Sequence, residues 1–225
     1  LEATGIGRSD ARAFESGVSA GSGDDDHAYF DFGVFAYEDG AYDEARNHFR
    51  MALDFDPDNP KYHQYIGRTF LKQDRLDEAA VHLQRAMEIN PDLPGLKHDA
   101  AMLYFLQGDN ARASALFERA AAESSDDVLA RYYAGVTLFR LERYEDAAGY
   151  FLEAAEKSPE ARTRGRYYAG VAYQKSGQSD RALKLFERLM EDPDAGEFAQ
   201  LAREWATVIR EGGAGKRPWQ LFLEL

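Results

Sequence analysis

Histidines and carboxylates are the residues of this sequence with the widest choice of chemistry. The five histidines are His27, His48, His63, His82 and His98. His48 and His82 are separated by one period of a repeat described below, so they are equivalent positions rather than a pair. The sequence has no HExxH helix motif, no Gly-rich phosphate loop and no GxSxG nucleophile motif. We therefore expect no histidine-based catalytic or metal site.

A run of aspartates at residues 54–59 (DFDPDN) resembles the start of a calcium loop. It lacks the glycine at the sixth position, and Tyr65 stands where the twelfth-position glutamate would be. Pro57 and Pro60 instead favour a turn between helices. The chain has no cysteine, which excludes disulfides, thiol nucleophiles and Cys-ligated zinc. These observations predict a protein that is not an enzyme and that holds no metal or cofactor.

Charge also limits the classes of partner. Lys and Arg number 27 against 40 Asp and Glu, which gives a formal net charge of −13. Such a surface repels nucleic-acid phosphates and anionic lipid as a whole. No apolar run approaches the roughly 18–20 residues that span a bilayer. We therefore expect neither a nucleic-acid partner nor membrane insertion of this region, whereas 44% apolar residues suffice for a core.

An exact repeat organises the residues that remain. The hexapeptide RYYAGV occurs at Arg131–Val136 and again at Arg166–Val171. Each copy carries a small residue, followed twelve positions later by Ala and then by a large apolar residue. The same spacing recurs upstream at a nearly constant interval. The small residues are Gly33, Gly67, Ala101, Gly135 and Gly170; the alanines are Ala45, Ala79, Ala113, Ala147 and Ala182; the large apolar residues are Phe49, Leu83, Phe117, Phe151 and Phe186.

This pattern resembles the tetratricopeptide repeat (TPR) family, whose unit is a helix–turn–helix of about 34 residues. The resemblance covers five units, at 26–59, 60–93, 94–127, 128–162 and 163–196. It implies an all-α solenoid that winds into a right-handed superhelix with a concave face. Acidic pairs such as Asp43–Glu44 and Glu145–Asp146 would begin the second helix of a unit, where the helix dipole favours them.

Both ends of the array have their own character. Residues 1–25 are predicted to be a flexible segment, because residues 15–26 are Gly/Ser-rich and then acidic. Phe14, about one repeat period before Phe49, suggests the remnant of an upstream repeat. Residues 197–211 predict an amphipathic capping helix. Residues 212–225 combine a Gly-rich hinge with period-two alternation, typical of a strand. This tail either packs on the last helices or begins a further domain, and it is similar to the entry into an outer-membrane β-barrel.

The concave face is the candidate binding site. In TPR arrays the first helix of each unit lines it, and the family register assigns positions 2, 5, 9, 12 and 13 of each unit to ligand. Six of these 25 positions are basic and one is acidic, whereas acidic residues outnumber basic residues in the whole chain. The predicted groove residues are Phe30, Tyr37, Arg68, Lys72, His98, Phe105, Tyr132, Phe139, Arg140, Tyr167 and Lys175.

Three functions are consistent with this sequence. The first is a non-enzymatic scaffold or adaptor whose groove binds a protein or peptide segment with acidic and apolar character. The second is a structural module of a bacterial envelope secretion or polysaccharide-export machine. The third is an accessory domain of an enzyme. The strand-like tail favours a periplasmic over a cytoplasmic location, and some of the groove aromatics, with Tyr133 and Tyr168 beside them, can instead pack between helices.

Overall fold

The computed structural model of the chain describes residues 25–212. The predicted upstream remnant around Phe14 and the strand-like tail fall on residues 1–24 and 213–225, outside the described residues. The chain divides into two compact units, residues 1–107 and residues 108–225. Each unit is considered by itself below.

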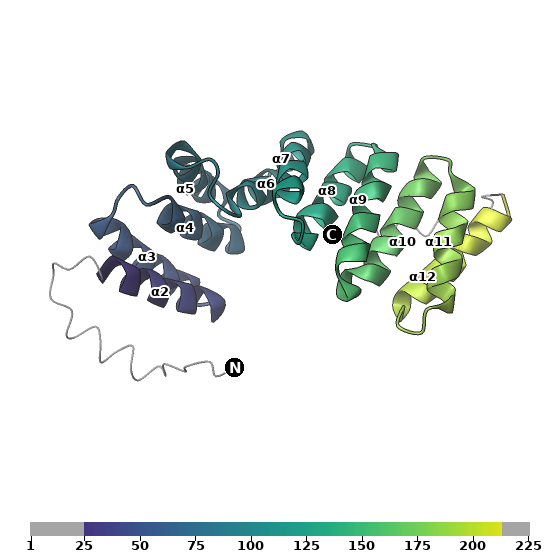
Figure 1. Cartoon of the computed structure of the whole chain (residues 1–225), viewed down its shortest axis with the longest axis horizontal. Coiled ribbons are helices and arrows are strands. Elements are labelled where there is room, and N and C mark those ends of the chain that lie inside the picture. Colours follow the sequence, from purple (N-terminus) through teal and green to yellow (C-terminus); the bar gives the residue numbers. More distant parts are fainter. Residues whose placement is uncertain (1–24, 213–225) are drawn as a thin grey trace. The chain divides into compact units, whose positions relative to one another are not determined.

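The N-terminal unit is built from helical hairpins, in which each helix packs on its neighbour in sequence (Figure 1). Its core contains large side chains such as Phe49, Tyr62, Ile66 and Leu83, each at most 1% exposed. The described helices are α2 (Asp25–Glu38), α3 (Tyr42–Phe55), α4 (Pro60–Lys72), α5 (Leu76–Ile89) and α6 (Leu96–Leu106).

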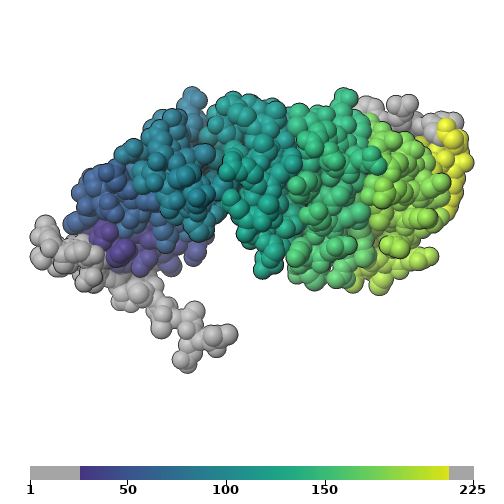
Figure 2. Space-filling view, turned by 45° about the horizontal axis from the view of Figure 1, so that its top comes forward, coloured from purple at the N-terminus to yellow at the C-terminus, as the bar shows by residue number. Residues whose placement is uncertain are grey.

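The C-terminal unit continues the same alternation. Phe117, Phe151 and Phe186 are fully buried in it, one in each second helix. Within each unit, successive helices occupy consecutive bands in the space-filling view (Figure 2). The helices are α7 (Asn110–Glu123), α8 (Val128–Arg140), α9 (Tyr144–Lys157), α10 (Pro159–Lys175), α11 (Ser179–Glu191) and α12 (Glu197–Arg210).

The small residues of the repeat lie where two helices of a pair come closest. A Cβ added at Gly170 would lie 2.7 Å from Cε1 of Phe186, and one at Gly135 would lie 2.8 Å from Cδ1 of Phe151. Side chains this close would push the hairpin apart. The predicted all-α helical repeat fold is confirmed, and the part of the chain from 25 to 212 contains helices and turns only. The division between the units falls in the third predicted repeat, so α6 and α7 belong to different units.

Side-chain caps fix where several helices begin. The Asp127 carboxylate accepts a hydrogen bond from the Ala130 amide at 2.8 Å at the start of α8. Ser158 caps α10 in the same way, and Pro159 occupies the first turn, where it has no hydrogen bond to lose. Helix α10 therefore begins at 159, before the predicted unit boundary at 163.

The turn within each repeat uses one backbone conformation throughout. Gly40, Gly108 and Gly177 all have φ near +80°, in the left-handed region. The equivalent residues of the second and fourth repeats are Asp74, with φ of 57°, and Glu142, with φ of 61°. A side chain in this conformation costs roughly 1–2 kcal/mol, so these two turns are maintained by the packing of the helices they join.

None of the helices between residues 25 and 212 combines the length and the apolar character needed to cross a membrane.

Candidate functional site

A mixed aromatic and basic surface runs along two neighbouring first helices of the C-terminal unit. Helix α8 contributes the half-buried Tyr132 and Phe139 and the exposed Arg140, and α10 contributes the exposed Arg164 and Lys175. The guanidinium carbon of Arg164 lies 6.0 Å from the centre of the Tyr132 ring, which ties the two helices together. We call these five residues the α8–α10 face.

The tyrosines of this region are neutral hydrogen-bonding groups. The Tyr132 and Tyr168 rings lie 5.9 Å apart. Burial raises the pKa of the Tyr132 hydroxyl, and the neighbouring Tyr168 adds to the effect. Burial also raises the pKa of Tyr168, although Tyr132 and Arg164 oppose that shift. Both phenols therefore stay protonated over the physiological pH range, and the positive charge of the face comes from Arg and Lys.

Tyr167 belongs to the core rather than to the open face. It is 5% exposed because α12 covers it. The Trp205 indole donates a hydrogen bond to the Tyr167 hydroxyl at 3.2 Å, and the Phe198 ring lies 5.3 Å away. The TPR register predicts that the Tyr167 side chain contacts a ligand, but in this structure its hydroxyl accepts a hydrogen bond from Trp205 of α12.

In the N-terminal unit, Arg68 has an internal partner. Its Nε donates to Oδ2 of Asp99 at 2.7 Å, and Gln64 donates to the same oxygen at 2.6 Å. The side chain of Asp99 is 9% exposed. Burial raises the pKa of Asp99, and the charge of Arg68 opposes the shift. Removing the arginine would leave a buried carboxyl with one neutral partner, so Arg68 has a structural role whatever else it binds.

Phe30 and Tyr37, the aromatic candidates on α2, also pack inside this unit. Phe30 is 6% exposed and stacks on Tyr62, with ring centres 5.1 Å apart. The ammonium of Lys61 lies 4.6 Å above the Phe30 ring and shields it further. Tyr37 is half-buried against Tyr65, and burial raises its pKa. Phe30 is thus a core residue, and Tyr37 offers only part of its ring.

The remaining candidates of this unit are more open. Lys72 is exposed in the last turn of α4, while His98 and Phe105 are half-buried on α6. The predicted set is therefore divided: six members lie in the N-terminal unit and five in the C-terminal unit. Of the six in the N-terminal unit, three lie against the Tyr65 ring: Phe30, Tyr37 and Arg68. Of the second five, Tyr132, Phe139, Arg140 and Lys175 lie on the α8–α10 face.

Sequence reasoning missed Asp99, whereas Gln64 holds one of the 25 register positions without being among the predicted groove residues. A signal for Asp99 existed in the register, since it occupies the position held by Tyr65, Tyr133 and Tyr168 in other repeats. Those tyrosines pack on the phenylalanine of the preceding second helix, as Tyr168 does on Phe151 with ring centres 5.6 Å apart. An aspartate among such residues indicates a buried ion pair, because a charge at a buried position needs a partner.

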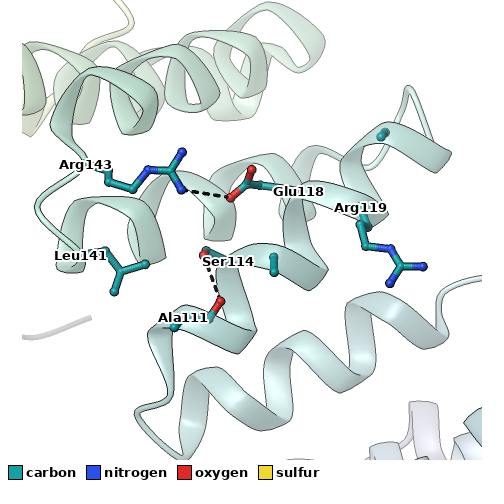
Figure 3. Close-up of a pocket in the computed structure, with 8 residues that line it drawn as sticks. Ala111, Ser114, Glu118, Arg119, Leu141 and Arg143 are labelled. Atoms are coloured by element: carbon teal, nitrogen blue, oxygen red, sulfur yellow. Dashed lines mark hydrogen bonds and ion pairs between the residues drawn. The ribbon is translucent and has the colours of Figure 1, made fainter.

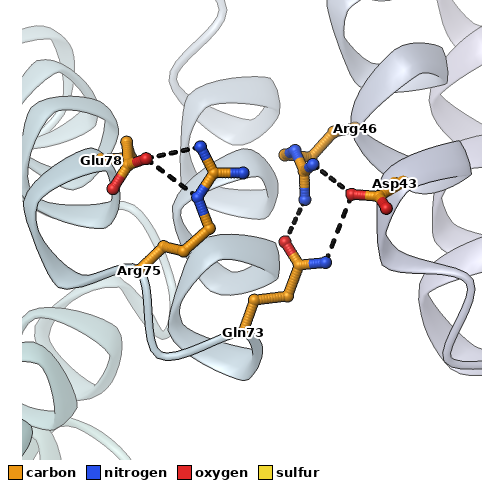
Figure 4. Close-up of polar contacts among 5 residues, drawn as sticks. All are labelled: Asp43, Arg46, Gln73, Arg75 and Glu78. Carbon is orange, nitrogen blue, oxygen red and sulfur yellow. Dashed lines mark hydrogen bonds and ion pairs between the residues drawn. The ribbon is translucent and has the colours of Figure 1, made fainter.

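Acidic residues that begin second helices are paired locally. Asp43 bonds with Arg46 and accepts from the Gln73 amide at 3.3 Å, and Arg46 also donates to Gln73 (Figure 4). The Gln73 and Arg46 hydrogen bonds lower the pKa of the Asp43 carboxyl. Next to them, Arg75 Nε donates to Glu78 at 2.9 Å. This cluster joins α3 to the turn between α4 and α5, and its charges are largely balanced.

An open groove lies along α7 in the C-terminal unit (Figure 3). It has a volume of about 560 Å³ and a floor of alanines. Arg143 and Glu118 approach each other at its edge, at 3.9 Å, and Arg119 lies on its wall. None of the predicted groove residues lines it, and two of its charged side chains, Arg143 and Glu118, pair with each other.

Two histidines of the N-terminal unit form a direct contact. Nδ1 of His63 lies 3.1 Å from Nδ1 of His82, and Nε2 of His63 lies 3.1 Å from the Pro57 carbonyl oxygen. Since a carbonyl only accepts, His63 carries its proton on Nε2 and accepts at Nδ1, so His82 donates. Burial, followed by the electrostatic effect of the neighbouring His63, lowers the pKa of His82 to about 4. Between residues 25 and 212 no three or more metal-ligating side chains are grouped to hold an ion.

Comparisons with known proteins agree with this geometry. Models described as tetratricopeptide repeat match residues 9–60 and 98–162, residues 36–97 and residues 165–195. A search of curated proteins found no match. The crystal structure of MamA is similar with a TM-score of 0.65 and 19% identity, covering 88% of this chain and all of that one. That of YrrB is similar with a TM-score of 0.68 and 18% identity, covering 86% of this chain and 96% of that one.

At these identities the structural likenesses show the fold, and the family follows from the sequence models, one of which alone covers more than half of the chain. The repeat register, the helical hairpins and the buried small–large contacts within them lead to the same assignment. The chain belongs to the tetratricopeptide repeat family.

Proposed function

We propose that this protein is a non-enzymatic interaction scaffold and that the α8–α10 face binds an extended protein segment with acidic and apolar character. The observation that carries the proposal is the sign of the charge on this face. Arg140, Arg164 and Lys175 are all exposed there, although the chain has a net charge of −13. The family assignment supports the class of function. YrrB, one of the structurally similar proteins, is described as a TPR protein with an unusual peptide-binding site.

The spacing of the cations suggests the shape of the ligand. On α10, Arg164 lies at one end of the α8–α10 face and Lys175 lies at the other end, eleven residues later. A helix rises about 1.5 Å per residue, so the two positions are roughly 16 Å apart. An extended segment covers that distance in about five residues. We therefore expect a ligand whose two carboxylate groups are separated by about five residues.

The surface between the cations is apolar. Tyr132 and Phe139 are half-exposed there, and Val136 and Val171, at 3% and 2% exposure, form its base. Aromatic side chains give large contact areas at a low cost in conformational entropy. One or two apolar side chains of the ligand would therefore lie between its acidic groups.

A competing explanation exists for two of the cations. Arg140 and Lys175 lie in the last turns of α8 and α10, where a positive charge stabilises the helix dipole. Arg164 is not in a last turn, so this explanation does not apply to it. Binding and stability must therefore be measured on the same variants.

The test begins with a phage-displayed library of random dodecapeptides selected on the full chain. We expect selected peptides to carry two acidic residues about five positions apart with an apolar residue between them. A hydrogen bond to a charged group contributes roughly 1.5–3 kcal/mol, so Arg140→Ala and Arg164→Ala should each weaken a selected peptide about tenfold or more by calorimetry.

Arg119→Ala is the matched control, since it removes an exposed arginine from α7 and should leave the affinity unchanged. Circular dichroism confirms that helix content is equal in all variants. If the Arg140/Arg164 double variant binds the selected peptides as tightly as the wild type, the α8–α10 face is not the binding site. The envelope-module alternative rests on the strand-like pattern of residues 213–225, and nothing in residues 25–212 favours it or the enzyme-accessory alternative.

A further inference from the structure

The contact between a cation and an aromatic ring on the α8–α10 face has an equivalent in the N-terminal unit. There the ammonium of Lys61 lies 4.6 Å from the centre of the Phe30 ring, as the guanidinium carbon of Arg164 lies 6.0 Å from the centre of the Tyr132 ring. In both pairs a cation at position 2 of one repeat covers a ring at position 5 of the preceding repeat. The two contacts therefore mark the same place on two separate pairs of first helices.

The cations at the other end of each pair correspond as well. Lys72 is exposed eleven residues after Lys61 on α4, and Lys175 is exposed eleven residues after Arg164 on α10. A helix rises about 1.5 Å per residue, so the cations of each pair are roughly 16 Å apart along the helix. Helix α4 thus presents two positive charges with the spacing found on α10.

The apolar part of this surface lies on α2. Tyr37 is half-buried at position 12, the position that Phe139 holds on α8, and Val34 is half-buried about one turn before it. Phe30, at 6% exposure, forms the base of the surface beneath Lys61. We call the following five residues the α2–α4 face: Phe30, Tyr37, Glu38, Lys61 and Lys72.

The helix dipole does not account for the charge of Lys61. This residue follows Pro60 in the first turn of α4, where the dipole disfavours a cation. Lys72 lies in the last turn, where the dipole favours one. Within residues 25–212, neither lysine forms an ion pair with a carboxylate. Both ammonium groups are therefore available to an acidic ligand, and the position of Lys61 is unfavourable for helix stability alone.

We propose that the α2–α4 face is a second binding site for a segment with acidic and apolar character, so that one chain binds two such segments at once. The inference rests on the proposed function, because the class of ligand is the one assigned to the α8–α10 face. The carboxylates of the second segment lie at Lys61 and Lys72, about five extended residues apart, and its apolar side chain lies on Tyr37.

One position distinguishes the two faces. At position 13 of the first repeat in each pair, α8 has the exposed Arg140 and α2 has the exposed Glu38. Arg68 of α4 does not compensate, because its guanidinium is held by the buried Asp99. A hydrogen bond to a charged group changes affinity about tenfold or more, so the α2–α4 face should bind an acidic segment at least about tenfold more weakly.

Calorimetry on the full chain tests the second site. The ligand is a synthetic dodecapeptide with two glutamates five positions apart and a leucine between them. We expect two peptides to bind each wild-type chain with unequal affinities, and one peptide to bind the Lys61→Met/Lys72→Met variant with the stronger affinity retained. Methionine keeps an apolar side chain over Phe30 and removes the charge, and circular dichroism checks that helix content is unchanged.

Glu38→Arg adds a variant that should gain affinity. In the Arg140→Ala/Arg164→Ala background, in which the α8–α10 face is disabled, it should strengthen binding of the remaining peptide about tenfold or more. Asp54→Arg in the same background is the matched control. Asp54 is exposed on α3, outside the α2–α4 face, so this variant makes the same change in net charge and should leave the affinity unchanged.

The outcomes separate this inference from the proposed function. One peptide bound per wild-type chain, with an affinity that the double methionine variant and Glu38→Arg leave unchanged, would overturn the second site and leave the α8–α10 face in place. Equal gains from Glu38→Arg and Asp54→Arg would also overturn it, since affinity would then follow net charge alone. If the double alanine variant binds as tightly as the wild type, the proposed function fails, and a loss of binding in the double methionine variant then still supports the α2–α4 site.

Discussion

Two glycine-to-alanine substitutions on adjacent helices should change stability in opposite directions. Gly165 lies on α10, and a Cβ added there would meet the Phe151 carbonyl oxygen at 2.5 Å and the Ala155 methyl group at 2.9 Å. Gly149 lies on α9, where an added Cβ meets nothing within 4 Å. The chemical change is identical, so the difference between the two variants isolates the helix–helix approach.

The expected magnitudes follow from two terms. Within a helix, alanine is more stable than glycine by about 1 kcal/mol. Gly149→Ala should therefore raise the free energy of unfolding by roughly that amount. In Gly165→Ala the same gain is opposed by overpacking against backbone, which cannot rotate away and typically costs about 1–3 kcal/mol for a core methyl group. The short contact with the carbonyl oxygen places this site at the upper end, so we expect a net loss of about 1–2 kcal/mol.

Urea unfolding followed by circular dichroism measures both variants, and thermal unfolding should show shifts of roughly 2–4 °C per kcal/mol. Ala155→Gly in the Gly165→Ala background should not recover the loss, since the carbonyl oxygen remains and glycine within α9 itself costs about 1 kcal/mol. A Gly165→Ala variant as stable as the wild type would refute the reasoning, because α9 and α10 could then not approach as closely as described.

Three other predictions concern strained or buried groups. Glu142→Gly should stabilise the protein by about 1 kcal/mol in urea unfolding, because Glu142 has a φ of 61° that glycine adopts freely; a loss would show that its side chain matters more than its backbone. Burial lowers the pKa of His82 from 6.5 to about 4, so the unfolded chain binds more protons between these values, and stability falls as the pH falls from 7.5 to 5. After allowance for partial exposure, His82→Leu should remove about 1 kcal/mol of that pH dependence; a variant with the wild-type pH profile would contradict the assignment. Arg68→Ala should cost about 2–3 kcal/mol in urea unfolding, since it leaves Asp99 buried with one neutral partner, whereas Lys72→Ala should change stability by less than about 0.5 kcal/mol; similar losses would argue against the ion pair.

The repeat register was sufficient to predict the helical pairs, because close helix packing imposes small residues at fixed intervals. Gly135 and Gly170 are small for the same reason: each faces a fully buried phenylalanine. Glycine marks three of the turns, at Gly40, Gly108 and Gly177, because it adopts the left-handed backbone freely. Asp74 and Glu142 adopt the same left-handed backbone as Gly108, although aspartate adopts this conformation only occasionally and glutamate rarely. The packing of the helices on both sides imposes this left-handed conformation, so the residue types at the two turns are not sufficient to predict it.

The binding face was harder to predict. The position of a residue in the repeat predicts which way its side chain points, but it does not predict which other side chains cover it. Tyr132 and Tyr167 occupy the same position in consecutive repeats. Tyr132 is half-exposed, whereas Tyr167 is buried beneath Trp205. The difference arises because α12 follows the last repeat, and no property of the hexapeptide RYYAGV encodes it. Phe30 is buried for a similar reason, through contacts with the next repeat.

A cation is informative about function only where the fold does not already account for its charge. Lys72, Arg140 and Lys175 recur at one position, in the last turn of three first helices, where the helix dipole alone accounts for a positive charge. Arg68 is accounted for by Asp99. Arg164 caps no helix end; it contacts the Tyr132 ring, as Lys61 at the equivalent position of the second repeat contacts the Phe30 ring. A loss of affinity in Arg164→Ala without a loss of stability would therefore have no structural explanation. It would identify the α8–α10 face as a surface maintained for a ligand.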